Sequence, residues 1–103
     1  MDILKFKARK NMGYSYIEGR NYLGHGPNIS GANYLCDAIN KANAGKVVYP
    51  ALEELIKTGE ADAAEVKREA ERLAKRVRAK NVKGMLGLLA CAAAQAKKVI
   101  TIS

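Results

Sequence analysis

The sequence predicts a small α+β domain, in which an antiparallel sheet made of an N-terminal hairpin and a C-terminal strand packs against about four helices. Apolar and polar residues alternate near the N-terminus, and a short β-branched run stands at the C-terminus; both patterns are typical of strands. Between them, apolar residues recur every three or four positions, as they do in amphipathic helices. A length of 103 residues fits one domain, 1–103.

The N-terminal hairpin is predicted within residues 1–18. Residues 4–8 alternate apolar with basic side chains, which is the pattern of a strand with one solvent-facing side. Residues 11–13 (Asn-Met-Gly) supply turn chemistry, and residues 14–17 then read as the second strand. The basic stretch 5–10 could instead be a mobile arm.

The first two helices are predicted from their capping signals. Ser30 is the expected N-cap of a helix over about residues 31–43, which Gly45 would end. Pro50 suits the first turn of the second helix, and Gly59 suits its end.

The third helix and the last strand follow from the same kind of signal. Asp62 and Glu65 have the spacing of a capping box, so we expect a helix to begin there and to end near Asn81. The β-branched run 99–102 is expected to join the N-terminal hairpin and complete the sheet.

The fourth helix, over residues 82–97, is apolar on nearly every side. Such a helix is normally central to a core or buried in an oligomer interface. A stripe of small residues would allow a second copy to approach closely, so we expect a homo-oligomer. The stripe consists of Gly84, Gly87, Cys91 and Ala94.

The positive charge is concentrated in the last third of the chain. Residues 1–71 contain ten basic and ten acidic side chains, whereas residues 72–103 contain eight basic side chains and no acidic one. The whole net charge of +8 therefore belongs to residues 72–103. This distribution favours an anionic partner: nucleic acid, a phosphorylated small molecule or an acidic protein surface.

Residues 19–30 contain three glycines and a proline without helical or strand periodicity, and we predict an ordered, functional loop there. A glycine-rich loop that runs into a helix start can bind an anion through free backbone N–H groups. We therefore expect a non-enzymatic protein that holds a phosphate-bearing, nucleotide-like ligand. Arginine and glycine backbone would contact the phosphate, and aromatic rings the base. The predicted ligand-binding residues are Arg20, Tyr22, Gly24, His25, Gly26, Ser30, Gly31 and Tyr34. The alternative is a structured loop whose glycines only satisfy turns.

A second hypothesis is a basic interaction module that binds nucleic acid or an acidic protein through residues 72–83. Arg72, Lys75, Arg76 and Lys83 can share one side at helical spacing and follow a phosphate backbone. No aromatic residue interleaves with them, and a solvated helix end explains the same run.

Catalysis and metal binding are disfavoured. His25 is the single histidine; it could act as a general base in a third, enzymatic hypothesis, but no nucleophile–base pair is evident beside it. The two cysteines lack metal-ligand spacing and fall in apolar stretches, where we expect buried, reduced thiols. No cofactor is predicted. With neither a signal sequence nor an apolar run long enough to cross a membrane, the cytoplasm is the expected location.

No motif aligns the chain with a named family. Its size, compactness and lack of catalytic residues are similar to those of small accessory proteins of phages and other mobile elements. Some of these inhibit bacterial defence, by blocking a protein or by sequestering a nucleotide signal. The resemblance implies a viral, non-catalytic binding protein, and a counter-defence role in which a nucleotide is sequestered.

Overall fold

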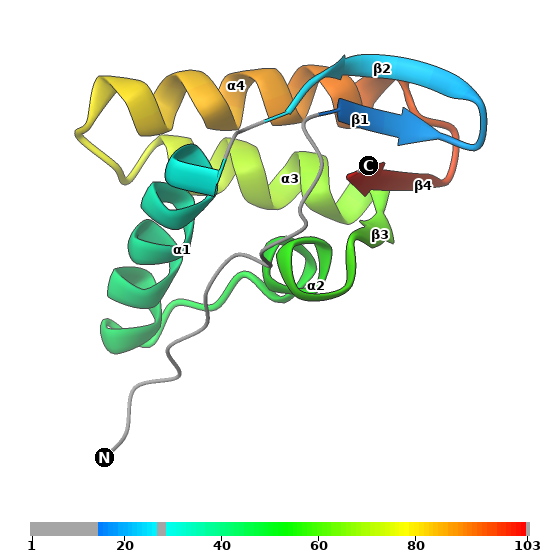
Figure 1. The fold of residues 1–103 in the computed structure, drawn as a ribbon. Coiled ribbons are helices and arrows are strands. Elements are labelled where there is room, and N and C mark those ends of the chain that lie inside the picture. Colours follow the sequence, from blue (N-terminus) through cyan, green and yellow to red (C-terminus); the bar gives the residue numbers. More distant parts are fainter. Residues whose placement is uncertain (1–14, 27–28, 103) are drawn as a thin grey trace.

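The computed structural model describes residues 15–26 and 29–102 (Figure 1). Over these residues the chain is an α+β fold, as predicted, with a four-stranded antiparallel sheet packed against four helices. The elements, in chain order, are β1 (Ser15–Glu18), β2 (Asn21–His25), α1 (Ile29–Ala44), α2 (Pro50–Thr58), β3 (Glu60–Asp62), α3 (Ala63–Ala74), α4 (Lys80–Gln95) and β4 (Val99–Ile102).

The sheet has the strand order β2-β1-β4-β3, with antiparallel neighbours throughout. The predicted C-terminal strand is confirmed as β4, which lies between β1 and β3. One face of the sheet is buried against the helices, because alternate residues of a strand point to the same side. The buried residues of the sheet are Tyr16, Leu23, Ala61, Ile100 and Ile102.

The hairpin that the structure describes lies one strand further along the chain than the predicted one, and its first strand, β1, corresponds to the strand predicted at residues 14–17. It joins β1 to β2 through a two-residue turn at Gly19 and Arg20, and Gly19 has the positive φ (+62°) that the first position of a type II′ turn requires. The strand predicted at residues 4–8 lies outside the described residues. Among the described residues, β1 pairs with β2 on one side and with β4 on the other.

The prediction of a loop over residues 19–30 is wrong for its central part, because Asn21–His25 form β2. The register between β1 and β2 shifts next to Tyr16, so that Leu23 is an extra residue of β2 and its side chain enters the core. Gly24 follows with φ +156°, and a Cβ atom there would contact Ala92 of α4. The contact would be an ordinary one, so the structural reason for this glycine is its φ, which residues with a side chain rarely adopt.

Helix α1 begins at Ile29, so Ser30 lies inside its first turn and is not the predicted N-cap. The predicted end at Gly45 is confirmed, since α1 ends at Ala44, but the left-handed residue is the next one. Lys46 takes the left-handed conformation (φ +66°), its N–H donates to Asn43, and the N–H of Val47 donates to Ala42. These two bonds form a Schellman motif with lysine at the position where glycine is usual.

The capping predictions for α2 and α3 are confirmed. Pro50 opens α2, and Gly59 ends it in the left-handed conformation (φ +92°) with its N–H bonded to the carbonyl of Leu55. The Asp62 side chain accepts a hydrogen bond from the Glu65 N–H at 3.0 Å, as a helix N-cap does.

Helix α3 is shorter than predicted. It ends at Ala74, and Asn81 belongs to the first turn of α4. The connection 75–79 reverses the chain, so that α3 and α4 lie side by side as a helical hairpin (Figure 1). This reversal brings Val82 and Leu86 back to the core that α3 has begun with Leu73.

Only one side of α4 is buried within the chain, so it is not the central core helix that was one of the two expectations; burial in an oligomer interface stays a prediction. Val82, Leu86, Leu89, Ala92 and Ala93 face the core. The opposite side is exposed and contains all four residues of the predicted small-residue stripe, together with Leu88, which is 58% exposed. Cys91 is therefore exposed, contrary to prediction, whereas Cys36 is buried as expected.

Candidate functional site

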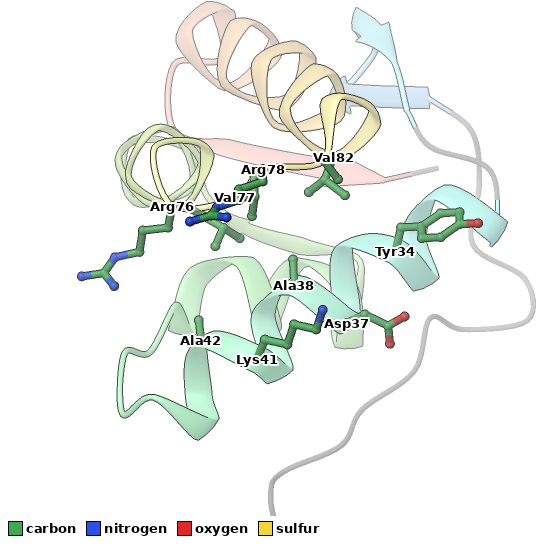
Figure 2. A pocket seen from close by; sticks show the side chains of 11 residues that line it. Tyr34, Asp37, Ala38, Lys41, Ala42, Arg76, Val77, Arg78 and Val82 are labelled. Carbon is green, nitrogen blue, oxygen red and sulfur yellow. The ribbon is translucent and has the colours of Figure 1, made fainter.

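A cleft of about 540 Å³ lies between α1 and the segment that connects α3 to α4 (Figure 2). Its floor is apolar, and its rim carries polar and charged side chains. The floor consists of Ala38, Ala42, Leu73, Val77 and Val82, and the rim of Tyr34, Asp37, Lys41, Arg76 and Arg78, with Ala79 beside them.

Each wall follows from local structure. Tyr34, Asp37 and Lys41 are spaced by three and four residues, so one side of α1 presents them together. Arg76 and Arg78 come from the connection 75–79, where the chain leaves α3 and turns back into α4. Figure 2 shows Ala38 and Val82 between these two walls, with Tyr34 at one end of the cleft and Arg76 at the other.

The cleft has a net positive charge. It contains the cations Lys41, Arg76 and Arg78 against the single acid Asp37. Among the described residues, the two recorded salt bridges lie on α3, and neither uses a cation of the cleft. The charges of Lys41, Arg76 and Arg78 are thus available to an anion that enters the cleft.

A second hollow, of about 700 Å³, lies on the other side of Arg76. It is more open and more polar than the cleft, and its lining comes from the connection between α1 and α2, the first residue of α2, one side of α3 and the turn after α3. The lining residues are Lys46, Val47, Val48, Pro50, Glu65, Arg68, Glu69, Arg72 and Arg76.

Both acids of the second hollow already have partners. Glu65 forms a salt bridge with Arg68. Glu69 is 4% exposed, and its carboxylate accepts hydrogen bonds from the N–H groups of Ala51 (2.9 Å) and Leu52 (3.1 Å) at the start of α2. The guanidinium carbon of Arg72 lies 5.5 Å from the centroid of the Tyr49 ring, a cation–π distance.

The structure separates the residues predicted to bind a ligand. Arg20 is exposed in the β1–β2 turn, whereas His25 and Gly26 stand at the other end of β2. A five-residue strand spans about 16 Å, so Arg20 does not reach an anion held at the start of α1. Tyr22 is 64% exposed on β2 and does not line the cleft.

The remaining predicted residues are on or beside α1. Ser30 and Gly31 lie in its first turn, and Tyr34 follows one turn later. Tyr34 is 54% exposed, and among the residues whose side chains the structure describes it is the one member of the predicted ligand set that lines the cleft. Gly24 meets a backbone requirement of β2, which accounts for that glycine without a ligand.

The residues of the alternative hypothesis are also divided. Arg72 and Arg76 line the second hollow, and Arg76 lines the cleft as well, while Lys75 and Lys83 are exposed outside both. Sequence reasoning missed Lys41, Lys46 and Arg68, and it included Arg78 only in the basic run 72–83. Arg68 could have been found, because 68, 72 and 76 are spaced by four. Lys41 and Lys46 required the tertiary arrangement.

The part of the chain that the structure describes contains neither a metal-binding cluster nor a membrane-spanning helix. Residues 15–26 and 29–102 contain no group of three His, Cys, Asp or Glu side chains placed to hold a metal ion. No helix among these residues is long and apolar enough to cross a membrane.

Burial raises the pKa of the Cys36 thiol to about 11, which leaves it in the unreactive protonated form at neutral pH.

The chain matches no family model, no curated protein and no solved structure, so its function is argued from the cleft itself.

Proposed function

We propose that this chain is a non-enzymatic binding protein for a phosphate-bearing, nucleotide-like ligand, and that the cleft between α1 and the α3–α4 connection holds this ligand. The observation that supports the proposal is the pairing of an apolar floor with three cations at the rim, Lys41, Arg76 and Arg78. This pairing matches a molecule with a flat apolar part and an anionic part.

The dimensions and chemistry of the cleft suit such a molecule. Small-molecule sites typically have volumes of about 300–1,000 Å³ and a mostly apolar lining with a few polar groups. Guanidinium groups bind phosphate through two parallel hydrogen bonds, and the ammonium of Lys41 adds a third source of charge. The exposed Tyr34 ring offers a face on which a base can stack.

The cleft replaces the glycine-rich segment as the proposed site. The cations lie around the cleft, whereas Arg20 is at the far end of β2 from the start of α1. Tyr34 belongs to both the predicted set and the cleft, so it is retained. The role implied by the resemblance to phage proteins, sequestering a nucleotide signal, is compatible with a site of this size and stays part of the proposal.

The test is calorimetric titration with ATP, with adenosine as the uncharged match. We expect ATP to bind, adenosine to bind much more weakly, and Arg78→Ala to weaken ATP binding by roughly tenfold or more, since a charged hydrogen bond contributes about 1.5–3 kcal/mol. Arg20→Ala, which also removes one exposed arginine, should change the affinity less than twofold. The opposite order of these two variants would return the site to residues 19–31, and no binding of ATP or any other nucleotide would overturn the proposal.

A second candidate function is supported by the cations outside the cleft. Lys75, Lys80 and Lys83 are exposed beside Arg76, and residues 72–102 contain no acid, so this corner could dock on duplex nucleic acid or an acidic protein. Salt separates the two candidates. Contacts with many phosphates weaken steeply between low and physiological salt, whereas a single ligand in a cleft is affected much less.

A further inference from the structure

The cleft and the second hollow meet at Arg76, which lines both. In Figure 2 its side chain extends away from Tyr34 and Asp37, at the end of the cleft farthest from them. An anion bound in the cleft is therefore next to a second recess with cations of its own. The two hollows share this one lining residue, and we refer to them together as the basic channel.

The second hollow is organised as a row of arginines facing a lysine. Arg68, Arg72 and Arg76 follow one another at intervals of four residues. Arg68 and Arg72 lie on α3, about 6 Å apart along its axis, and Arg76 lies in the turn after it. Lys46 lies on the opposite wall, where the Schellman motif at the end of α1 fixes its backbone. Such a row matches a chain of regularly spaced phosphates.

The two acids in this hollow, Glu65 and Glu69, cancel only part of the charge of its four cations, so the hollow stays net positive. Glu65 pairs with Arg68, and the Glu69 carboxylate accepts the N–H groups of α2. Within the described residues, no recorded salt bridge involves Lys46, Arg72 or Arg76. The Tyr49 ring lies against the guanidinium of Arg72 and restricts its position, which lowers the entropy cost of a phosphate contact.

We infer that the ligand is longer than one nucleotide. The geometry points to a short single-stranded nucleic acid, with one nucleotide in the cleft and its phosphodiester chain passing Arg76 into the second hollow. This inference rests on the proposed function, because the first nucleotide occupies the same cleft. A single strand fits better than a duplex, since its unpaired base can enter the recess and stack on Tyr34, which within residues 15–26 and 29–102 is the one exposed aromatic ring that lines either hollow.

The experiment compares oligothymidylates of one, two, four and eight nucleotides at physiological salt, by calorimetry with the full chain. We expect the affinity to rise at least tenfold between one and four nucleotides and to change little beyond, because the channel is then filled. An affinity that does not depend on length would overturn the inference and leave the proposed function intact. Failure of every length, the mononucleotide included, would remove both.

Two variants test whether the rise in affinity between one and four nucleotides comes from the second hollow. Arg72→Ala and Lys46→Ala should each remove most of the gain for the four-nucleotide probe while leaving the mononucleotide within twofold. Lys46→Ala does not disturb the Arg72–Tyr49 contact, so it remains informative if Arg72→Ala is unstable. Lys67→Ala is the matched control, because it removes one charge from α3 outside both hollows. If Lys67→Ala weakens the longer probe as much as the other two, the gain is a general effect of net charge and the inference is wrong. Tighter binding of a duplex of equal length would also contradict it.

Discussion

Glu18 fastens the end of β1 to the turn between α4 and β4. Its carboxylate accepts hydrogen bonds from the N–H groups of Lys97 (2.7 Å), Lys98 (2.7 Å) and Val99 (3.0 Å). These bonds lower the pKa of the carboxyl, because they favour its charged form. A single side chain thus satisfies three donors that the turn would otherwise leave to water.

The pH dependence of stability follows from this shift. The pKa of Glu18 is lower in the folded than in the unfolded chain, so its contribution is complete above the unfolded value, about 4.3, and is lost as the pH falls through the folded value. We expect Glu18→Gln to lower the urea midpoint at pH 7, and the difference from the unmodified chain to narrow near pH 3. Glu71→Gln, in the exposed pair with Lys67, should have little effect at pH 7. A gap for Glu18→Gln that stays constant from pH 7 to pH 3 would contradict this account.

The sequence predicted residues with local roles and missed those with distant partners. The N-cap at Asp62 and the left-handed end at Gly59 depend on bonds within a few residues, so their spacing was sufficient. Glu18 bonds to residues about eighty positions away, and nothing near it in the sequence indicates this. In the same way Tyr34 was predicted from its neighbourhood, whereas Lys41 and Arg78 become neighbours only when the chain folds.

At the scale of elements, Glu69 joins α3 to α2. Tyr49 precedes α2 without a capping side-chain bond, and the buried Glu69 carboxylate takes the N–H groups of Ala51 and Leu52 in its place. A carboxylate is well placed there, because the N-terminus of a helix carries a partial positive charge. The junction of two helices therefore depends on one acid from the core.

Replacing this acid should loosen the junction. In Glu69→Gln an amide nitrogen takes the place of one oxygen and the charge is lost, so we expect the free energy of unfolding to fall by roughly 1–3 kcal/mol. Amide hydrogen exchange at the start of α2 should accelerate as well. Glu54→Gln, an exposed change on α2, is the control and should stay within about 0.5 kcal/mol. If both variants unfold at the same urea concentration, Glu69 does not cap α2.

The elements that the sequence missed are those that depend on tertiary partners. Strand β3 is three residues long and carries no apolar alternation beyond Ala61; it is a strand because it pairs with β4. Residues 75–81 have the composition of a helix, and α3 nevertheless ends at Ala74, because the chain must reverse for Val82 and Leu86 to reach the core. At this point the packing of α4 against the core outweighs the helix propensity of residues 75–81.

At the scale of the whole molecule, the outer side of α4 is an exposed surface that could take part in association. Its inner side completes the core, and its outer side has no charged residue between positions 84 and 94. Gly84, Gly87 and Ala94 would allow a second helix to approach closely, and the exposed Leu88 would lose contact with water when it does. Self-association through this side, which the sequence led us to expect, stays a prediction.

Native mass spectrometry over a range of protein concentrations tests whether the chain associates with itself through the outer side of α4. We expect a dimer, since an apolar helix side without charge can meet its own copy about a two-fold axis. Leu88→Lys should convert the dimer to a monomer, because it places two like charges near that axis. Val48→Lys is the matched control: Val48 is exposed to the same degree, 59% against 58%, but lies in the second hollow away from the outer side of α4. A monomer at every concentration, or equal loss of the dimer in both variants, would show that this side of α4 does not carry association. The exposed stripe would then be a consequence of how α4 packs on one side only.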